Sequence, residues 1–202
     1  MEGTELCTDI NILNLPYPKT MEVKVLITEL QTERLELRKM QVSDSPGLFK
    51  IWSDPEVTRF MNVRCFTAEN QAIEMIQLLD DLSQDNKAIR FSIIHKESGE
   101  IIGSCGYNAF NFANGTAEIG YDLAQSYWGK GYASEAVSSL VEYAFSSWKL
   151  KRIEAKVEPE NLNSIKLLQK LGFTYEGIFS RDKGAEEAAS DLYLYSKSTS
   201  TS

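Results

Sequence analysis

A short glycine-containing loop joins an apolar, strand-like run to a helical pattern, and it constrains this chain more than any other feature. Residues 117–123 are typical of a strand, the loop 125–131 follows, and apolar residues then recur at helical spacing from Ala136 onward. Glycines let successive backbone N–H groups turn inward, and the first turn of a helix adds unpaired N–H groups and a positive end. Such a strand–loop–helix unit can bind phosphate through its backbone.

Two common phosphate-binding motifs do not fit this loop. The dinucleotide fingerprint G-x-G-x-x-G requires Gly or Ala where Ser134 stands. A P-loop requires a glycine at the position of Ala124, and Ser or Thr at the position of Gly131. Spacing alone therefore leaves two alternatives open, a phosphate site of another kind and a plain glycine-rich loop before a helix.

The remaining sequence predicts one mixed α/β domain. Of 202 residues, 43% are hydrophobic and 25% charged, as in ordinary globular proteins. Antiparallel strand-like runs, with a hairpin turn at 97–100, precede a strand–helix–strand–helix–strand section. We expect an extended arm over residues 1–27, the domain over 28–196, and a disordered low-complexity tail over 197–202.

Charge and composition exclude several partners. The formal net charge is −8, whereas nucleic-acid binding requires a positive surface. No apolar run reaches the roughly 18 residues of a membrane span, and the first residues lack a signal-peptide pattern, so we expect a cytoplasmic protein without a membrane partner. The acidic surface attracts cationic substrates or serves solubility only. Three widely spaced cysteines (Cys7, Cys65, Cys105) predict free thiols, with Cys105 buried, and no zinc or other metal site.

Three motifs occur in an order that matches a known family. The first combines the strand 117–123 with residues 127–136 (YWGKGYASEA), the second comprises 161–168 and 171–173, and the third is the early run 32–38 (TERLELR). Together they resemble the GNAT superfamily of N-acetyltransferases, and most closely the branch of ribosomal-protein N-terminal (alanine/serine) acetyltransferases. One departure is Ser126, where the superfamily often has Gln or Arg.

The resemblance implies a fold and a cofactor site. It implies a mixed, mostly antiparallel sheet of six to seven strands with about four helices, and a V-shaped split between the strand 117–123 and the parallel strand 153–157. Acetyl-CoA would bind in this split as co-substrate, with the N–H of Leu123 near the thioester oxygen. The implied cofactor-binding residues are Leu123, Trp128, Gly129, Lys130, Gly131, Tyr132, Ala133 and Asn161.

Glu118 and Ser164 are the catalytic candidates. Acetyl transfer requires an ammonium group to lose a proton, and Glu118 can serve as general base, bind the substrate, or simply face solvent or a surface cation. Many superfamily members have a tyrosine at the position of Leu168 that protonates the leaving thiolate, so that role is open here. Ser164 can donate to the sulfur or cap a helix.

The acceptor pocket is expected within residues 51–80. Asn62, Arg64 and Phe66 are the predicted substrate-binding residues, whereas Trp52 and Phe60 are better explained by packing between two helices.

Two functions remain open at this point. The first is an N-acetyltransferase that transfers acetyl directly, in a ternary complex, to a protein N-terminus such as that of a ribosomal protein, or to a small amine. The second is a non-catalytic acyl-CoA-binding sensor or interaction module on the same fold. The sequence names neither the acceptor nor the oligomeric state, a homodimer included.

Overall fold

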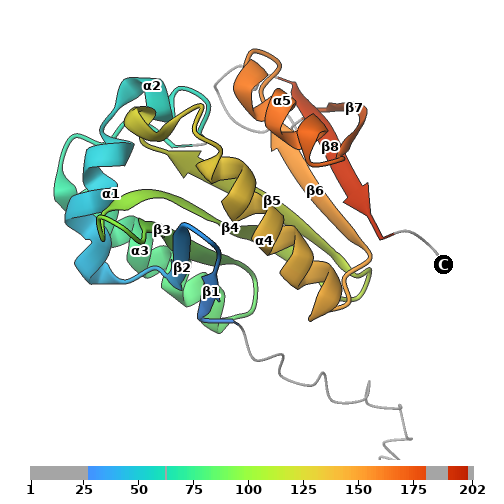
Figure 1. Ribbon diagram of the computed structural model, residues 1–202, viewed down its shortest axis with the longest axis horizontal. Coiled ribbons are helices and arrows are strands. Elements are labelled where there is room, and N and C mark those ends of the chain that lie inside the picture. The colour runs from blue at the N-terminus through green and yellow to red at the C-terminus, as the bar shows by residue number, and fades with distance from the viewer. Residues whose placement is uncertain (1–26, 62, 181–190, 200–202) are drawn as a thin grey trace, which may run out of the picture.

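The computed structural model describes residues 27–61, 63–180 and 191–199, which form an open mixed sheet with helices on both faces (Figure 1). The strands of this sheet run in the order β1-β2-β3-β4-β5-β6-β8-β7. Their bounds are β1 Glu29–Gln31, β2 Leu35–Lys39, β3 Ile89–His95, β4 Ile101–Asn111, β5 Thr116–Leu123, β6 Arg152–Val157, β7 Thr174–Phe179 and β8 Leu192–Ser198.

Helices cover the two faces of the sheet in separate groups. The α-helices are α1 Ser45–Trp52, α2 Pro55–Thr58, α3 Glu69–Gln84, α4 Tyr132–Ser146 and α5 Leu162–Lys170, with short 3₁₀ turns at Val42–Asp44 and Gln125–Tyr127. Leu48 of α1 and Ile76 of α3 belong to one apolar cluster, whereas Leu140 of α4 and Leu168 of α5 belong to another that includes the central strands. We call the two sides of the sheet the α1/α3 face and the α4/α5 face.

Local sequence signals explain where the helices begin and end. Pro46 occupies the first turn of α1, where its missing N–H costs nothing. The Asn161 side chain caps α5 by accepting a hydrogen bond from the N–H of Ser164 at 3.1 Å. Gly172 follows α5 with φ +78°, a left-handed conformation that favours glycine.

The sheet divides between β5 and β6. These neighbours are parallel, and they pair only over Thr116–Glu118 and Arg152–Glu154. Beyond this point β5 continues beside β4, while β6 continues beside β8. The two strands therefore diverge, and Figure 1 shows β6, β8 and β7 turned away from the strands under α4. The V-shaped split implied by the family resemblance is present.

The predicted fold class is confirmed, with corrections of detail. Over the described residues the sheet has eight strands and the chain five α-helices, instead of six to seven strands and about four helices. The predicted tail boundary at residue 197 is wrong, because Lys197 and Ser198 belong to β8 and pair with β6. Residues 1–26 of the predicted arm and 200–202 of the tail lie outside the described residues. In the part of the chain that the structure describes, no helix is long and apolar enough to cross a membrane.

Candidate functional site

A cleft of about 710 Å³ opens where β5 and β6 separate. Glu118, Gly120 and Tyr121 of β5 line one side of it, and Lys156 of β6 lines the other. The end of α5 contributes the capping residue Asn161 and Ser164, and the opposite wall comes from α1, α3 and the segment before α3. The large apolar residues of that wall are Trp52, Phe60, Met61, Val63, Phe66, Met75, Leu79 and Leu82.

The glycine loop follows β5, the strand that lines one side of this cleft. Gly129 and Gly131 have φ of +71° and +86°, so both glycines are required by the backbone conformation. An added Cβ at Gly129 would meet nothing within 4 Å. Gly131 is the N-cap of α4, and it has no side chain to accept hydrogen bonds from the N–H groups of the first turn. The loop therefore leaves backbone donors at the positive end of a 15-residue helix.

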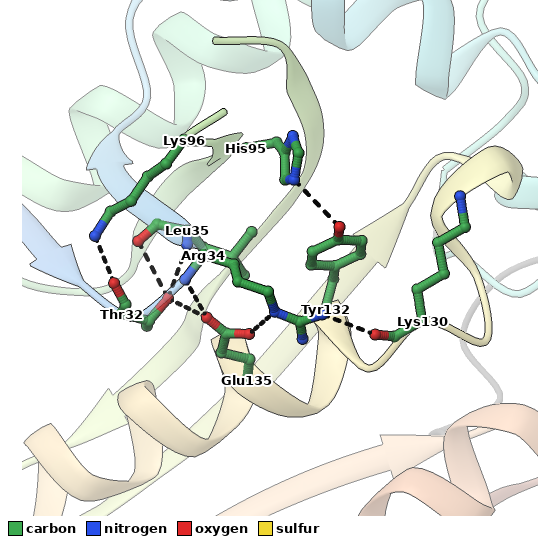
Figure 2. A network of polar contacts seen from close by, with 8 residues as sticks. All are labelled: Thr32, Arg34, Leu35, His95, Lys96, Lys130, Tyr132 and Glu135. Carbon is green, nitrogen blue, oxygen red and sulfur yellow. Dashed lines mark hydrogen bonds and ion pairs between the residues drawn. The ribbon is translucent and has the colours of Figure 1, made fainter. Parts of the chain in front are cut away.

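An arginine in the bend just before β2 clamps this loop (Figure 2). The guanidinium of Arg34 donates to the Lys130 carbonyl at 3.1 Å and to the Glu135 carboxylate at 2.7 Å. Its Cζ also lies 4.3 Å from the centre of the Tyr132 ring. Thr32 donates to the same Glu135 carboxylate at 2.6 Å. The segment before β2 therefore fixes the loop and the first turn of α4 together.

Aromatic residues of the loop are held by the β3–β4 hairpin. The Tyr127 hydroxyl donates to Glu100 at 2.7 Å, and this bond raises the pKa of Tyr127 and lowers that of Glu100. The Tyr132 hydroxyl lies 3.1 Å from Nε2 of His95. His95 thus belongs to the support of the loop.

The backbone of Leu123 is turned toward the split. Ala124 N donates to Ile102 O at 2.9 Å, so residue 124 directs its backbone groups at β4. Alternate residues of an antiparallel ladder point in opposite directions, which turns the N–H and C=O of Leu123 away from β4. The Leu123 carbonyl accepts from Nε1 of Trp128 at 2.7 Å, which is consistent with this direction.

Residues 34–174 match the family described as the acetyltransferase (GNAT) domain. The chain belongs to the GNAT acetyltransferase family. It is 54% identical over 167 residues to the uncharacterised N-acetyltransferase p20 of Bacillus licheniformis, covering 83% of this chain and 94% of that protein. It is 33% identical over 105 residues to the ribosomal-protein-serine acetyltransferase of Escherichia coli K12, covering 52% and 58%.

The fold of this acetyltransferase also matches solved structures. RimL, a ribosomal L7/L12 alpha-N-protein acetyltransferase solved in complex with coenzyme A, superposes with a TM-score of 0.74. The identity is 22%, and the match covers 83% of this chain and 95% of that one. At this identity the likeness supports the fold.

Glu118 of this acetyltransferase lies where the two strands part. Its carboxylate accepts from the Lys156 ammonium at 2.7 Å, and both side chains are about one quarter exposed, at 23% and 25%. Glu118 therefore lines the cleft and is also paired with a cation, Lys156.

The predicted donor Ser164 has a partner that sequence reasoning missed. Its hydroxyl lies 2.5 Å from the Tyr121 hydroxyl across the cleft. Burial raises the pKa of Tyr121 to about 12, although the hydrogen bond to Ser164 acts in the opposite direction. Because Asn161 caps α5, the Ser164 hydroxyl is not needed as a helix cap. Tyr121 lies two residues before Leu123 in the first family motif, which is the signal that could have indicated it.

The acceptor residues and the cysteines have mixed outcomes. Phe66 lines the cleft, whereas Arg64 is not among the residues that line it, and Asn62 lies outside the described residues. Trp52 is buried between α1 and α3 as expected, yet it also borders the cleft.

Cys105 is fully buried, and burial raises the pKa of its thiol to about 12, which opposes a covalent acetyl-cysteine route. Cys7 lies outside the described residues. Among the residues that the structure describes, no group of acidic, histidine and cysteine side chains could hold a metal ion.

Proposed function

We propose that this chain is an acetyl-CoA-dependent N-acetyltransferase that transfers the acetyl group directly to a primary amine in a ternary complex. The observation that carries the proposal is the split between β5 and β6, which begins at Glu118 and leads to a glycine loop at the start of α4. The glycine loop can accept a nucleotide pyrophosphate, and the split can accept a narrow chain with a reactive end. The family membership supplies the reaction class.

Acetyl-CoA fits the residues at this site. The open space around Gly129, the uncapped first turn of α4 and the absence of a side chain at Gly131 suit a pyrophosphate bound by backbone N–H groups. The adjacent Lys130 adds positive charge. The N–H of Leu123 faces the split and would donate to the thioester oxygen, an interaction worth about 2.7–4 kcal/mol in acyl-transfer enzymes. When bound, acetyl-CoA supplies an activated acetyl thioester.

Glu118 is the proposed general base. An ammonium has no lone pair, so the acceptor must lose a proton before its nitrogen can attack the thioester carbon. The Lys156 ammonium holds Oε2 of Glu118 at 2.7 Å, and this contact fixes the carboxylate at the mouth of the split. The proton passes from the amine to Glu118, directly or through water.

The Tyr121–Ser164 pair is the proposed proton donor to the departing sulfur. Two hydroxyl groups carry two protons, and the hydrogen bond between them uses one. The second proton is therefore available to a third group in the cleft. Because the pKa of Tyr121 lies near 12, this donor stays protonated at neutral pH. The pair takes the place of the tyrosine that Leu168 replaces.

A turnover screen tests this function. Acetyl-CoA is offered with N-terminal peptides, alkyl amines, polyamines, aminoglycosides and amino acids, and release of free CoA thiol is measured. The names of the ribosomal-protein acetyltransferases similar to this chain justify peptides with N-terminal Ser and Ala in the screen. Amine-dependent thiol release supports the enzyme. Tight acetyl-CoA binding without thiol release across the whole panel would support a sensor module instead.

A further inference from the structure

The wall of the cleft opposite Glu118 is apolar. Residues 118, 120 and 122 share one face of β5, and Asp122 accepts from Nε1 of Trp52 at 3.3 Å, so this is the α1/α3 face. Glu118 therefore points to the side where α3 presents Met75, Leu79 and Leu82 to the cleft. An acceptor amine at Glu118 therefore shares the cleft with these apolar side chains.

The floor of this compartment at Gly120 is covered by two polar side chains, Asn108 and Arg90. A Cβ at this position would lie 2.6 Å from Nδ2 of Asn108 and 3.0 Å from Nη1 of Arg90. Gly120 stands between Glu118 and Asp122 on the same face, and its missing side chain lets Asn108 and Arg90 lie close over the backbone of β5.

Few of the described residues that line the cleft are charged. The charged lining residues are two cations, Arg90 and Lys156, and two carboxylates, Glu118 and Glu158. Arg90 is neutralised from below by Asp122 at 2.7 Å, and Glu118 by Lys156 at the same distance. The chain as a whole carries a net charge of −8 and attracts cations in general, whereas the described residues at this compartment, Asp122 included, supply three carboxylates to two cations, an excess of one.

A polycationic acceptor fits this compartment poorly. Beyond Glu118, the described lining offers an acceptor one further carboxylate, Glu158, so a third ammonium group would lose its water against an apolar wall or lie near Arg90 or Lys156. Desolvating a charge without a partner is costly, and like charges add repulsion. By contrast, an apolar group placed there gains free energy in proportion to the surface that it buries.

We propose that the acceptor is an amine with a single cationic nitrogen and an apolar body. The nitrogen lies at Glu118, and the apolar body lies against Met75, Leu79 and Leu82. This inference rests on the proposed N-acetyltransferase function and names its substrate class. The same chemistry occurs in a free alkyl or aryl-alkyl amine and in a peptide whose N-terminal residue is apolar.

The first experiment compares acceptors on the unaltered protein. The n-alkyl amines from propyl to hexyl and 2-phenylethylamine are compared with spermidine and an aminoglycoside, and peptides with N-terminal Leu are compared with matched peptides carrying N-terminal Ser or Lys. We expect kcat/KM to rise about fourfold for each added methylene that the wall covers. Spermidine and the aminoglycoside should fall below n-butylamine. Preference for the free amines or for the Leu peptides identifies the source of the amine.

The second experiment changes the wall. Leu79→Glu places a carboxylate in the cleft and should lower kcat/KM for hexylamine at least tenfold while raising the relative rate with a 1,6-diamine. Leu78→Glu is the matched control, because Leu78 is 53% exposed on the same helix and does not line the cleft. It should leave both rates unchanged. Leu82→Glu replaces the first variant if that variant does not fold.

The outcomes separate this inference from the function beneath it. Spermidine or an aminoglycoside turned over faster than every apolar monoamine would overturn the substrate class and leave the acetyltransferase function standing. No thiol release with any amine, despite measurable acetyl-CoA binding, would overturn the proposed function itself. If Leu79→Glu and Leu78→Glu changed kcat/KM equally, the apolar residues of α3 would not contribute to acceptor recognition.

Discussion

Oε2 of Glu118 accepts a hydrogen bond from the Lys156 ammonium at 2.7 Å, across the point where β5 and β6 part. The same ammonium lies 4.1 Å from the centre of the Phe179 ring, so Lys156 is held on a second side. A fixed lysine orients the carboxylate and leaves Oε1 as the oxygen that we expect to meet the acceptor. The ion pair thus links the strand that begins the split to the chemistry proposed within it.

Glu118→Gln should abolish most of the activity without disturbing the fold. The amide oxygen can still accept from Lys156, but the amide cannot take a proton from the acceptor. We expect kcat to fall about 100-fold or more, with the affinity for acetyl-CoA unchanged. Steady-state kinetics and a direct binding assay measure the two quantities. Glu154→Gln, at the paired position of β6, is the control and should retain activity; equal losses in both variants would remove the base role from Glu118.

Gly131→Val should abolish acetyl-CoA binding. The φ of +86° disfavours any residue with a Cβ, and the new side chain would occupy the proposed pyrophosphate site. Gly172→Val supplies matched backbone strain at φ +78°, at the far end of α5, where a Cβ comes no closer than 3.6 Å to Lys197. Calorimetric titration should show lost affinity in the first variant only. Unchanged affinity in Gly131→Val would refute the loop assignment.

The fold was largely predictable because its signals are local. Hydrophobic periodicity and the Gly172 cap indicated α4 and α5, and the Ser98–Gly99 turn indicated the β3–β4 hairpin. The short β1 has only three residues, and its pairing with β2 arises from tertiary contacts that no periodicity encodes. The extension of β8 through Ser198 likewise depends on pairing with β6, which overrides the polar, low-complexity composition of that segment.

The glycine loop of the candidate site was predictable from the sequence. The contacts between side chains that lie far apart in the sequence were not. The glycine loop follows from its own sequence. Arg34 and Glu135, however, are 101 positions apart, and Tyr121 and Ser164 are 43 apart. Such pairs form only when strands and helices assemble, so a single sequence carries no local pattern for them. The same holds for the contact of Lys156 with Glu118.

Arg34→Met should weaken acetyl-CoA binding through the loop. The variant loses the hydrogen bonds to Lys130 O and to Glu135, while Glu135 keeps its bonds from Thr32 and the Arg34 backbone. We expect KM for acetyl-CoA to rise about tenfold, the loss typical of one or two charge-assisted hydrogen bonds, with kcat nearly constant.

Two further variants give the Arg34 experiment its controls. Arg34→Lys keeps the charge but not the planar fork, and it should resemble Arg34→Met if geometry matters more than charge. Lys87→Met removes an exposed cation paired with Asp85 and should leave KM unchanged. A normal KM in Arg34→Met would show that the loop keeps its shape without the clamp.

Tyr121→Phe and Ser164→Ala should each lower kcat about 100-fold, the lower end of the range expected for loss of a general acid. If the two hydroxyls act as one unit, the double variant should be no worse than the more severe single variant. Because burial raises the pKa of Tyr121 to about 12, the unaltered enzyme should show no loss of rate from Tyr121 ionisation below about pH 10. Pre-steady-state rates across pH 6–10 test this, with the exposed Tyr175→Phe as control. Additive losses in the double variant would mean that the hydroxyls act separately.

Glu176→Gln should reduce stability at neutral pH and have no effect in strong acid. Glu176 of β7 accepts from Arg152 of β6 and from Ser196 of β8, and these bonds lower its pKa to about 2. A carboxyl with a depressed folded-state pKa stabilises the fold fully above its unfolded pKa of about 4.3. That contribution is lost as pH falls from there through about 2. Since Glu176 is 37% exposed, we expect no more than about 1 kcal/mol.

Urea unfolding at pH 7, 4 and 3 tests the sign of this prediction. The difference between Glu176→Gln and the unaltered protein should be largest at pH 7 and shrink steadily toward pH 3. High salt should reduce it at pH 7, because the ion pair with Arg152 is partly exposed. Glu97→Gln, in the exposed β3–β4 turn, should show no difference at any of these pH values. A penalty for Glu176→Gln that stays constant over this range would assign the effect to packing between β7 and β8, since packing does not depend on the ionisation of one carboxylate.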